Sequence, residues 1–281
     1  MALASTMVGR SLGDRVILGG VVLLALLWIV PVAWVVVLSF KANQALMMST
    51  TSALHPPWTL KNYTDVMATS GVFHWFFNSI VVSGGSTLFT LILASLAGYG
   101  FARTEFPGRD ILFVVVLLGL AVPEQAVIIA RHQLFTSWKM HNTYIALILP
   151  GLSNAFGVFL MTQYFRAIPK DLDEAAMLDN ASRFKIFWRV LLPLTVPAQA
   201  TLGIYTFLNS WNDYLWPLIS ATRPEMFTLT VGIASTQTNF AQSEGLGFLM
   251  AQSVFAGLPV FIVYLFFQRY VVQAVAGAAI R

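Results

Sequence analysis

The first apolar run of the chain extends from Val16 to Phe40 and reads VILGGVVLLALLWIVPVAWVVVLSF. A helix needs about 20 apolar residues to cross the hydrocarbon core of a bilayer, so this run is long enough to span a membrane. It exceeds the apolar core of a signal peptide, and Lys41-Ala42-Asn43-Gln44 follows it in place of a small-residue cleavage site. We therefore expect a first transmembrane helix that is retained.

The composition of the whole chain agrees with a membrane protein. Of its 281 residues, 57% are hydrophobic and 10% are charged, whereas soluble domains carry roughly 25% charged residues. The net charge of +4 is better explained by basic loops beside a membrane than by binding to nucleic acid. The absence of cysteine excludes disulfides, thiol catalysis and thiolate metal sites.

Five further apolar runs follow, and they predict an all-α membrane protein with six transmembrane helices in a single domain, 1–281. Backbone groups find no partner in lipid, so a span can be interrupted only where the break is enclosed by protein. The third span carries such a break at Pro123-Glu124. The predicted spans lie at about 16–40, 76–102, 111–130, 143–165, 194–220 and 246–269, with a loop at about 166–193.

The basic residues predict that both termini are cytoplasmic, because cytoplasmic loops of membrane proteins are enriched in Lys and Arg. With the N-terminus inside, the cytoplasmic segments hold Arg10, Arg15, Arg103, Arg109, Arg166, Lys170, Arg183, Lys185, Arg189, Arg269 and Arg281. The outer segments hold only Lys41, Lys61, Arg131, Lys139 and Arg223.

The loop at 166–193 has the pattern of two short helices. Asp171 and Glu174 have the spacing of a capping box, which predicts a helix that starts at Asp171. Asp179-Asn180 should end this helix, because Asn tolerates the left-handed conformation better than other non-glycine residues. Ser182 can then cap a second helix.

The second helix of the loop has an amphipathic pattern. Its apolar stripe is formed by Phe184, Phe187, Trp188 and Leu191, at i, i+3, i+4 and i+7. From this periodicity alone, a helix lying on the lipid surface is an equally good interpretation. Its basic residues Arg183, Lys185 and Arg189 would then face anionic headgroups.

The order of residues in this loop resembles the EAA loop of ABC importer permeases, and the resemblance extends over nearly the whole chain. In the loop, Glu174-Ala175-Ala176 is followed by Asp179, Asn180 and Ala181, with Asn180 where the family usually has Gly. The flanks are similar to the second permease of maltose-type carbohydrate importers. They comprise Pro57-Trp58-Thr59-Leu60-Lys61-Asn62-Tyr63, Asn78-Ser79, Ala97-Gly98-Tyr99-Gly100-Phe101-Ala102-Arg103, Phe106-Pro107-Gly108, Trp211-Asn212-Asp213-Tyr214-Leu215-Trp216-Pro217-Leu218 and Gln268-Arg269-Tyr270.

The resemblance implies a type I ABC importer permease fold in the bacterial cytoplasmic (inner) membrane. It implies that the loop is a coupling helix that docks on a cytoplasmic ATPase through Glu174, Ala175, Ala176, Asp179, Asn180 and Ala181. The implied partners are a second permease subunit, a dimer of ATP-binding subunits, an extracytoplasmic solute-binding protein and membrane lipid. The solute would be a sugar or a sugar-like polyol.

An enzyme or a cofactor-binding protein is not favoured by the sequence. The phosphate-binding pattern G-x-x-x-x-G-K-[ST] is absent, so ATP and Mg²⁺ should be bound by a partner. The four histidines, His55, His74, His132 and His141, form no metal-spaced pair. We therefore expect no metal or other cofactor to be bound by this chain.

Polar residues inside the predicted spans are candidates for the solute pathway, because burying them in lipid is costly. An interfacial aromatic belt is the alternative for the tryptophans. An ion-coupled secondary transporter is the main rival function, since Glu124 and Asp213 could relay protons. A membrane enzyme or an assembly factor is the third candidate function. The pathway candidates are Glu124, Gln125, Asn154, Asn209, Trp211, Asn212 and Asp213.

Overall fold

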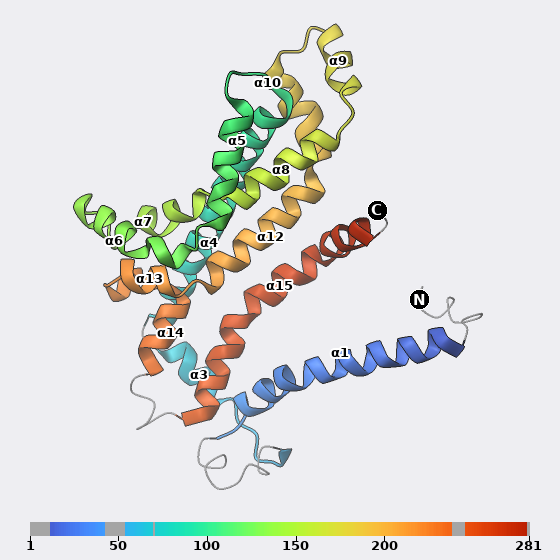
Figure 1. The fold of residues 1–281 in the computed structure, drawn as a ribbon. Helices are drawn as coiled ribbons and strands as arrows, with labels where there is room; N and C mark the ends of the chain where they lie inside the picture. The colour runs from blue at the N-terminus through green and yellow to red at the C-terminus, as the bar shows by residue number, and fades with distance from the viewer. Residues whose placement is uncertain (1–11, 43–53, 70, 238–244, 280–281) are drawn as a thin grey trace. The chain divides into compact units, whose positions relative to one another are not determined.

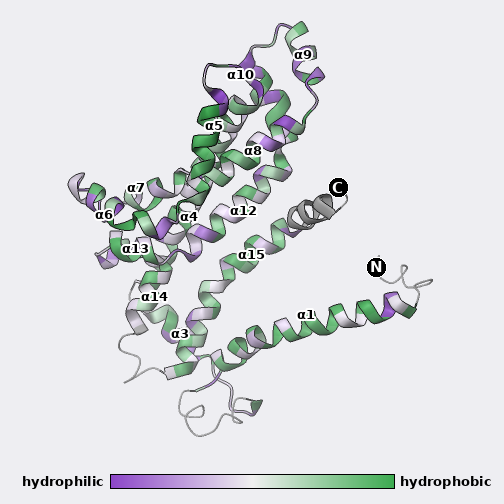
Figure 2. Ribbon diagram, viewed as in Figure 1, coloured by the Kyte–Doolittle hydropathy of each residue, from purple (hydrophilic) through white to green (hydrophobic). Residues whose placement is uncertain are grey.

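The computed structural model describes residues 12–42, 54–69, 71–237 and 245–279, and every regular element in these ranges is a helix. Three of the helices are each long and apolar enough to cross a membrane: α1 (Leu12–Ser39), α4 (Val72–Arg103) and α15 (Gly245–Ala279), the last through Gln268. Figure 2 shows α5 as hydrophobic over most of its length, whereas α9 and α10 carry hydrophilic patches.

Three more spans are possible if each of three bent helix pairs counts as one. The first pair joins α5 (Arg109–Leu118) and η2 (Gly119–Ala121) to η3 (Glu124–Val127) and α6 (Ile128–Ser137), with a bend of 93°. The break predicted at Pro123-Glu124 is therefore confirmed. The residues after it continue as α6 in a new direction rather than ending near 130.

The fourth predicted span, 143–165, contains a bend that the sequence did not predict, and its bounds stay a prediction. Here α7 (Tyr144–Ile148) and η4 (Leu149–Leu152) meet α8 (Ala155–Ala167) at 49°. Asn154 causes the new start, because its side-chain oxygen accepts a hydrogen bond of 2.7 Å from the backbone N–H of Gly157. In the sequence this asparagine was interpreted as a pathway residue.

The fifth predicted span is preceded by the second half of the loop predicted at 166–193. That half comprises α10 (Arg183–Ile186), the π-helical turn η5 (Phe187–Leu191) and α11 (Leu192–Leu194). They meet α12 (Val196–Asn212) at 76°. The span closes with α13 (Leu215–Ser220), and η6 (Pro224–Met226) and α14 (Leu229–Gln237) follow.

The chain divides into two compact units, so the single domain stays a prediction. Met1–Thr69 with Gln237–Phe255 forms the first, and Ser70–Thr236 with Ala256–Arg281 forms the second. In the first unit, Lys41 is fully buried and its Nζ donates to the carbonyl oxygens of His55 and Pro57. Asn62, on α3 (Lys61–Ala68), donates bonds of 2.8 Å to the carbonyls of Ser39 and Lys41.

The second unit is built around α4, which packs against both α8 and α12 (Figure 1). Gly98 of α4 lies directly on α8, where an added Cβ would be 2.6 Å from Cβ of Met161. Small residues at such contacts let helices in membranes approach closely. The buried core between these helices and the cytoplasmic loop consists of Ala94, Met161, Phe165, Ile186, Phe187, Leu191, Ala198 and Leu202.

Candidate functional site

The helix that carries the EAA motif is α9 (Asp171–Leu178), and its start differs from the predicted capping box. The cap is Lys170, which has helical backbone angles, and its carbonyl accepts from the N–H groups of Asp173 and Glu174 at 2.9 and 3.1 Å. Asp171 therefore lies inside the first turn and caps nothing with its side chain. The acidic residues of this turn still complement the positive end of the helix dipole.

The end of α9 agrees with the sequence prediction. Asn180 has a φ of 55°, and its N–H donates to the carbonyl of Met177 at 2.9 Å. The N–H of Ala181 reaches back to the carbonyl of Ala176 at 3.0 Å, which completes a Schellman motif. Ser182 then caps α10 by accepting a bond of 3.3 Å from the N–H of Lys185.

The outer surface of α9 is both acidic and apolar. Glu174, Ala175, Asp179 and Asn180 are exposed, and Leu178 is 85% exposed. The other two motif residues, Ala176 and Ala181, are half-buried against the core. The helix thus exposes a short acidic and apolar outer side, while its inner side is fixed to the bundle.

A residue pair that the sequence did not reveal fixes this inner side. Asp173, the buried residue of α9, forms an ion pair of 3.4 Å with Arg103 at the end of α4. Arg103 also donates a hydrogen bond of 2.5 Å to the carbonyl of Ile168, which caps α8. Arg103 stands in a motif quoted above, but nothing in the sequence indicates which acid it meets.

The amphipathic stripe predicted for 184–191 is only half right. Phe187 and Leu191 are buried together with Ile186, whereas Phe184 and Trp188 are 70% and 58% exposed. The π-helical turn η5 inserts an extra residue per turn and so rotates the buried side relative to an ideal helix. Phe184 and Trp188 stack on each other on the exposed side, with ring centroids 6.4 Å apart.

The other end of α4 holds a loop from the distant segment 224–229. Asn78 donates bonds of 2.8 and 2.9 Å to the carbonyls of Glu225 and Phe227, and accepts one of 2.6 Å from the hydroxyl of Tyr144. The neighbouring Ser79 accepts from the N–H of Leu229 at 2.8 Å. Asn78-Ser79 therefore joins α4 to α7 and to the loop before α14.

The two carboxylates among the pathway candidates have partners. Glu124 on η3 forms an ion pair of 2.9 Å with Arg131 on α6, and both lie after the bend that follows α5 and η2. Asp213 accepts backbone hydrogen bonds from Leu215 and Trp216 at the start of α13. Asp213 is also close enough to Glu124 and Arg131 for electrostatic interaction. Glu124, Arg131 and Asp213 thus lie in the same region, with the ion pair between Glu124 and Arg131 as the direct contact.

The remaining pathway candidates differ in accessibility. Trp211 is buried, and its indole N–H donates to the carbonyl of Ala256 at 3.1 Å. Asn154 is occupied in capping α8. Gln125, Asn209 and Asn212 are exposed, and the last two lie three residues apart on α12. Among the described residues, no group of three His, Asp or Glu side chains could hold a metal ion.

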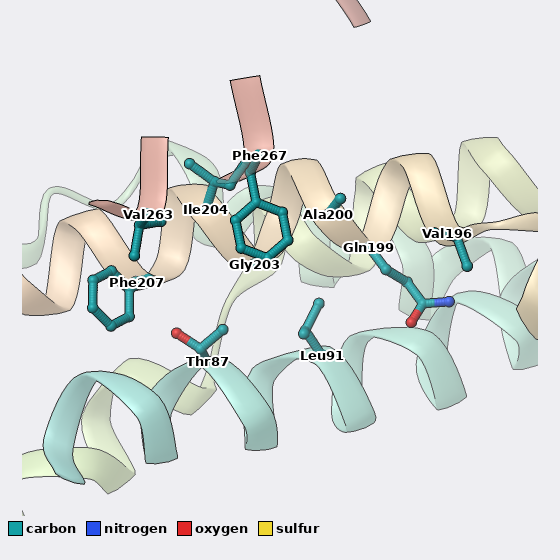
Figure 3. Close-up of a pocket in the computed structure, with 10 residues that line it drawn as sticks. All are labelled: Thr87, Leu91, Val196, Gln199, Ala200, Gly203, Ile204, Phe207, Val263 and Phe267. Carbon is teal, nitrogen blue, oxygen red and sulfur yellow. The ribbon is translucent and has the colours of Figure 1, made fainter. Parts of the chain in front are cut away.

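A cavity of about 330 Å³ lies among α4, α12 and α15. Figure 3 shows its two polar side chains, Thr87 and Gln199. Gln199 donates to the carbonyl of Leu192 and the hydroxyl of Thr195, both at 2.9 Å, and Thr87 donates to the carbonyl of Ser83. The amide and hydroxyl donors are thus already used within the protein, so they are not free to hydrogen-bond a sugar in the cavity. It is lined by Thr87, Leu91, Val196, Gln199, Ala200, Gly203, Ile204, Phe207, Val263 and Phe267.

Known proteins with similar sequences are permeases. The arabinooligosaccharides transport system permease protein of Bacillus subtilis is 34% identical over 262 residues, which cover 92% of each chain. The diacetylchitobiose uptake system permease protein of Streptomyces coelicolor is 32% identical over 264 residues, covering 92% of this chain and 87% of its own. The trehalose/maltose transport system permease protein of Thermococcus litoralis is 32% identical over 267 residues, covering 93% of this chain and 95% of its own.

The fold has a counterpart among solved structures. A chain of a bacterial ABC transporter involved in the import of the acidic polysaccharide alginate matches with a TM-score of 0.80 and 23% identity, covering 93% of this chain and 98% of its own. The model of the family described as binding-protein-dependent transport system inner membrane component matches residues 90–277. The chain therefore belongs to this family of membrane permeases of ABC importers.

Proposed function

We propose that this chain forms half of the passage through which an ATP-driven importer moves a sugar or sugar-like solute by alternating access. The observation that carries the proposal is the exposed, capped helix α9, whose residues 174–176 carry the motif that resembles the EAA loop. The chain is not an enzyme, since its family consists of membrane subunits. Relatives named for arabinooligosaccharides, diacetylchitobiose and trehalose/maltose support a sugar as the solute.

The proposed assembly contains a second permease, two ATP-binding subunits and an extracytoplasmic solute-binding protein. The last is supported by the family description and by a similar structure in complex with a periplasmic protein. ATP and Mg²⁺ would be bound by the ATP-binding subunits, and this chain would bind no cofactor. We place it in the bacterial inner membrane as one domain with six spans and both termini in the cytoplasm. A reporter fused after Arg281 that was active only outside would contradict this topology.

Docking of α9 on the ATPase can be tested by reversing the charge of Glu174. A lysine there would put a positive charge on the docking surface, and a mismatched charge at an interface costs several kcal/mol. We expect the Glu174→Lys variant to lose ATPase binding, and uptake with it, by about tenfold or more. Co-purification with a tagged ATPase and uptake into proteoliposomes measure both.

The matched control is Glu105→Lys, which reverses an exposed acid in the neighbouring loop between α4 and α5. This control should assemble and transport normally. Normal assembly and uptake in the Glu174→Lys variant would refute the docking role. Uptake that is driven by an ion gradient and needs neither ATP nor a partner would favour the secondary transporter instead.

A pathway role is best tested at Asn209 and Asn212, because their exposed amides can exchange hydrogen bonds with sugar hydroxyls. Losing both amides removes about 1–3 kcal/mol of net hydrogen bonding. We expect the Asn209→Ala/Asn212→Ala double variant to raise the KM for uptake about tenfold while assembly is unchanged. The control is Gln268→Ala, another exposed amide that donates to a carbonyl of its own helix. An unchanged KM would exclude these residues from the path.

A further inference from the structure

The inner end of α4 is joined to α9 through a buried pair of opposite charges. The side chains of Arg103 and Asp173 are only 5% and 11% exposed. A charge in such a place is tolerated only when it is paired, and removing one partner leaves the other uncompensated. Asp173 is also the residue of α9 that is buried. This pair joins α4 to α9 directly, beside the packing of Ala176 on the buried core.

The opposite end of α4 is joined to the loop 224–229 by side-chain hydrogen bonds. Trp75 donates to the carbonyl of Pro224 at 3.1 Å, next to the bonds that Asn78 makes to Glu225 and Phe227. Between Asn78 and Arg103, α4 is unbroken and contains no proline. At 1.5 Å per residue this stretch is about 37 Å long, more than the roughly 30 Å of a hydrocarbon core.

We propose that Arg103 and Asp173 form the joint through which displacement of α9 is passed to α4, and along α4 to the loop 224–229. The inference rests on the proposed function, because it assumes that α9 is the element that the ATPase moves. Both residues are positioning residues: neither lies on the exposed surface of α9, and neither is among the pathway candidates. A stiff helix with a polar joint at each end is a physically connected route between the two sides of the membrane.

The test uses the complete complex of both permeases and the ATPase in nanodiscs, with one reporter cysteine. The chain has no cysteine of its own, so Glu225→Cys, at an exposed position of the loop 224–229, is labelled without background from this chain. The maleimide labelling rate is compared without nucleotide and with ATP plus vanadate. We expect this rate to change with nucleotide, and we expect Arg103→Met to reduce that change about fivefold or more while the ATPase still co-purifies.

Three further variants keep the test decisive. The control Arg109→Met removes the cation of a more accessible ion pair, with Asp110 at the start of α5, and should respond like the parent. The charge-swapped variant Arg103→Asp/Asp173→Arg should recover part of the response. If Arg103→Met does not assemble, Arg103→Lys, which keeps the charge but loses the forked geometry, takes its place and should weaken the response.

The outcomes separate this inference from the proposed function. A parent complex that does not assemble, or whose labelling ignores nucleotide, would count against the proposed function itself. If the labelling rate changes with nucleotide in the parent and changes equally in the Arg103 variants, the proposed joint is wrong, while the proposed function stands. A charge swap that is no better coupled than Arg103→Met would overturn the pairing of these two residues.

Discussion

Replacing Gly98 with leucine should prevent the second unit from folding. The first atom of any side chain there would lie 2.6 Å from Cβ of Met161 and 2.9 Å from the backbone of Met161 and Thr162. Backbone atoms cannot rotate away as a flexible side chain does, so α4 and α8 would have to separate. Inserting even one methylene group into a packed core costs about 1–3 kcal/mol, and leucine inserts four carbon atoms.

The measurement is the yield of monodisperse protein after extraction from membranes, together with its thermal unfolding. Gly100→Leu is the matched control, because it lies on the same helix and nothing would be within 4 Å of its new Cβ. We expect this control to retain the parent yield and Gly98→Leu to give almost none. Equal yields and equal unfolding temperatures for the two variants would contradict the close contact between α4 and α8.

The second large effect is expected at Asn78. Leucine has nearly the same shape, but it would leave the carbonyl of Phe227 and the hydroxyl of Tyr144 without this partner. The carbonyl of Glu225 would keep only its contact of 2.7 Å with Nε2 of His74. Each unsatisfied buried group costs about 1–3 kcal/mol. We therefore expect Asn78→Leu to release the loop 224–229, with faster amide hydrogen exchange there, and to abolish uptake.

A graded variant tests the cause of this effect. Tyr144→Phe removes only the bond of 2.6 Å to Asn78 and leaves both bonds to the loop in place. It should therefore reduce stability without releasing the loop. Hydrogen exchange in 224–229 that is equal in Asn78→Leu and the parent would show that the loop is held by other contacts.

The sequence predicts the local features of this fold well, because they depend on residues close together in the chain. The break at Pro123, the left-handed Asn180 and the cap at Ser182 are all found in the structure. The capping role of Asn154 is not predicted, because an asparagine in an apolar run can equally be a pathway residue or a cap, and its pathway role stays a prediction. The capping box failed because Lys170 adopts helical angles one residue earlier.

The predictions that failed or were missing depend on tertiary contacts. The buried side of 184–191 is set by the π-helical turn, which hydrophobic periodicity assumes to be absent. The contacts of Asn78 with 225–227 and of Arg103 with Asp173 join residues that are far apart in sequence. Asn78 and Arg103 both belong to motifs of the sequence, yet the partner of a polar side chain cannot be derived from one sequence without a fold.

The bends in α5–α6 and α7–α8 have a consequence for the thickness of the barrier. The straight segment 109–121 and helix α8 each contain 13 residues, so each is about 20 Å long, against roughly 30 Å for a hydrocarbon core. A segment of this length that begins at one face of the hydrocarbon core ends inside it, so the non-helical backbone at 122–123 and 153–154 cannot rely on lipid for partners. The chain supplies them itself at Asn154, whose N–H donates to the carbonyl of Leu152 at 2.9 Å and whose carbonyl accepts from the N–H of Val158 at 3.1 Å. Each segment alone is therefore shorter than the apolar layer that a span has to cross.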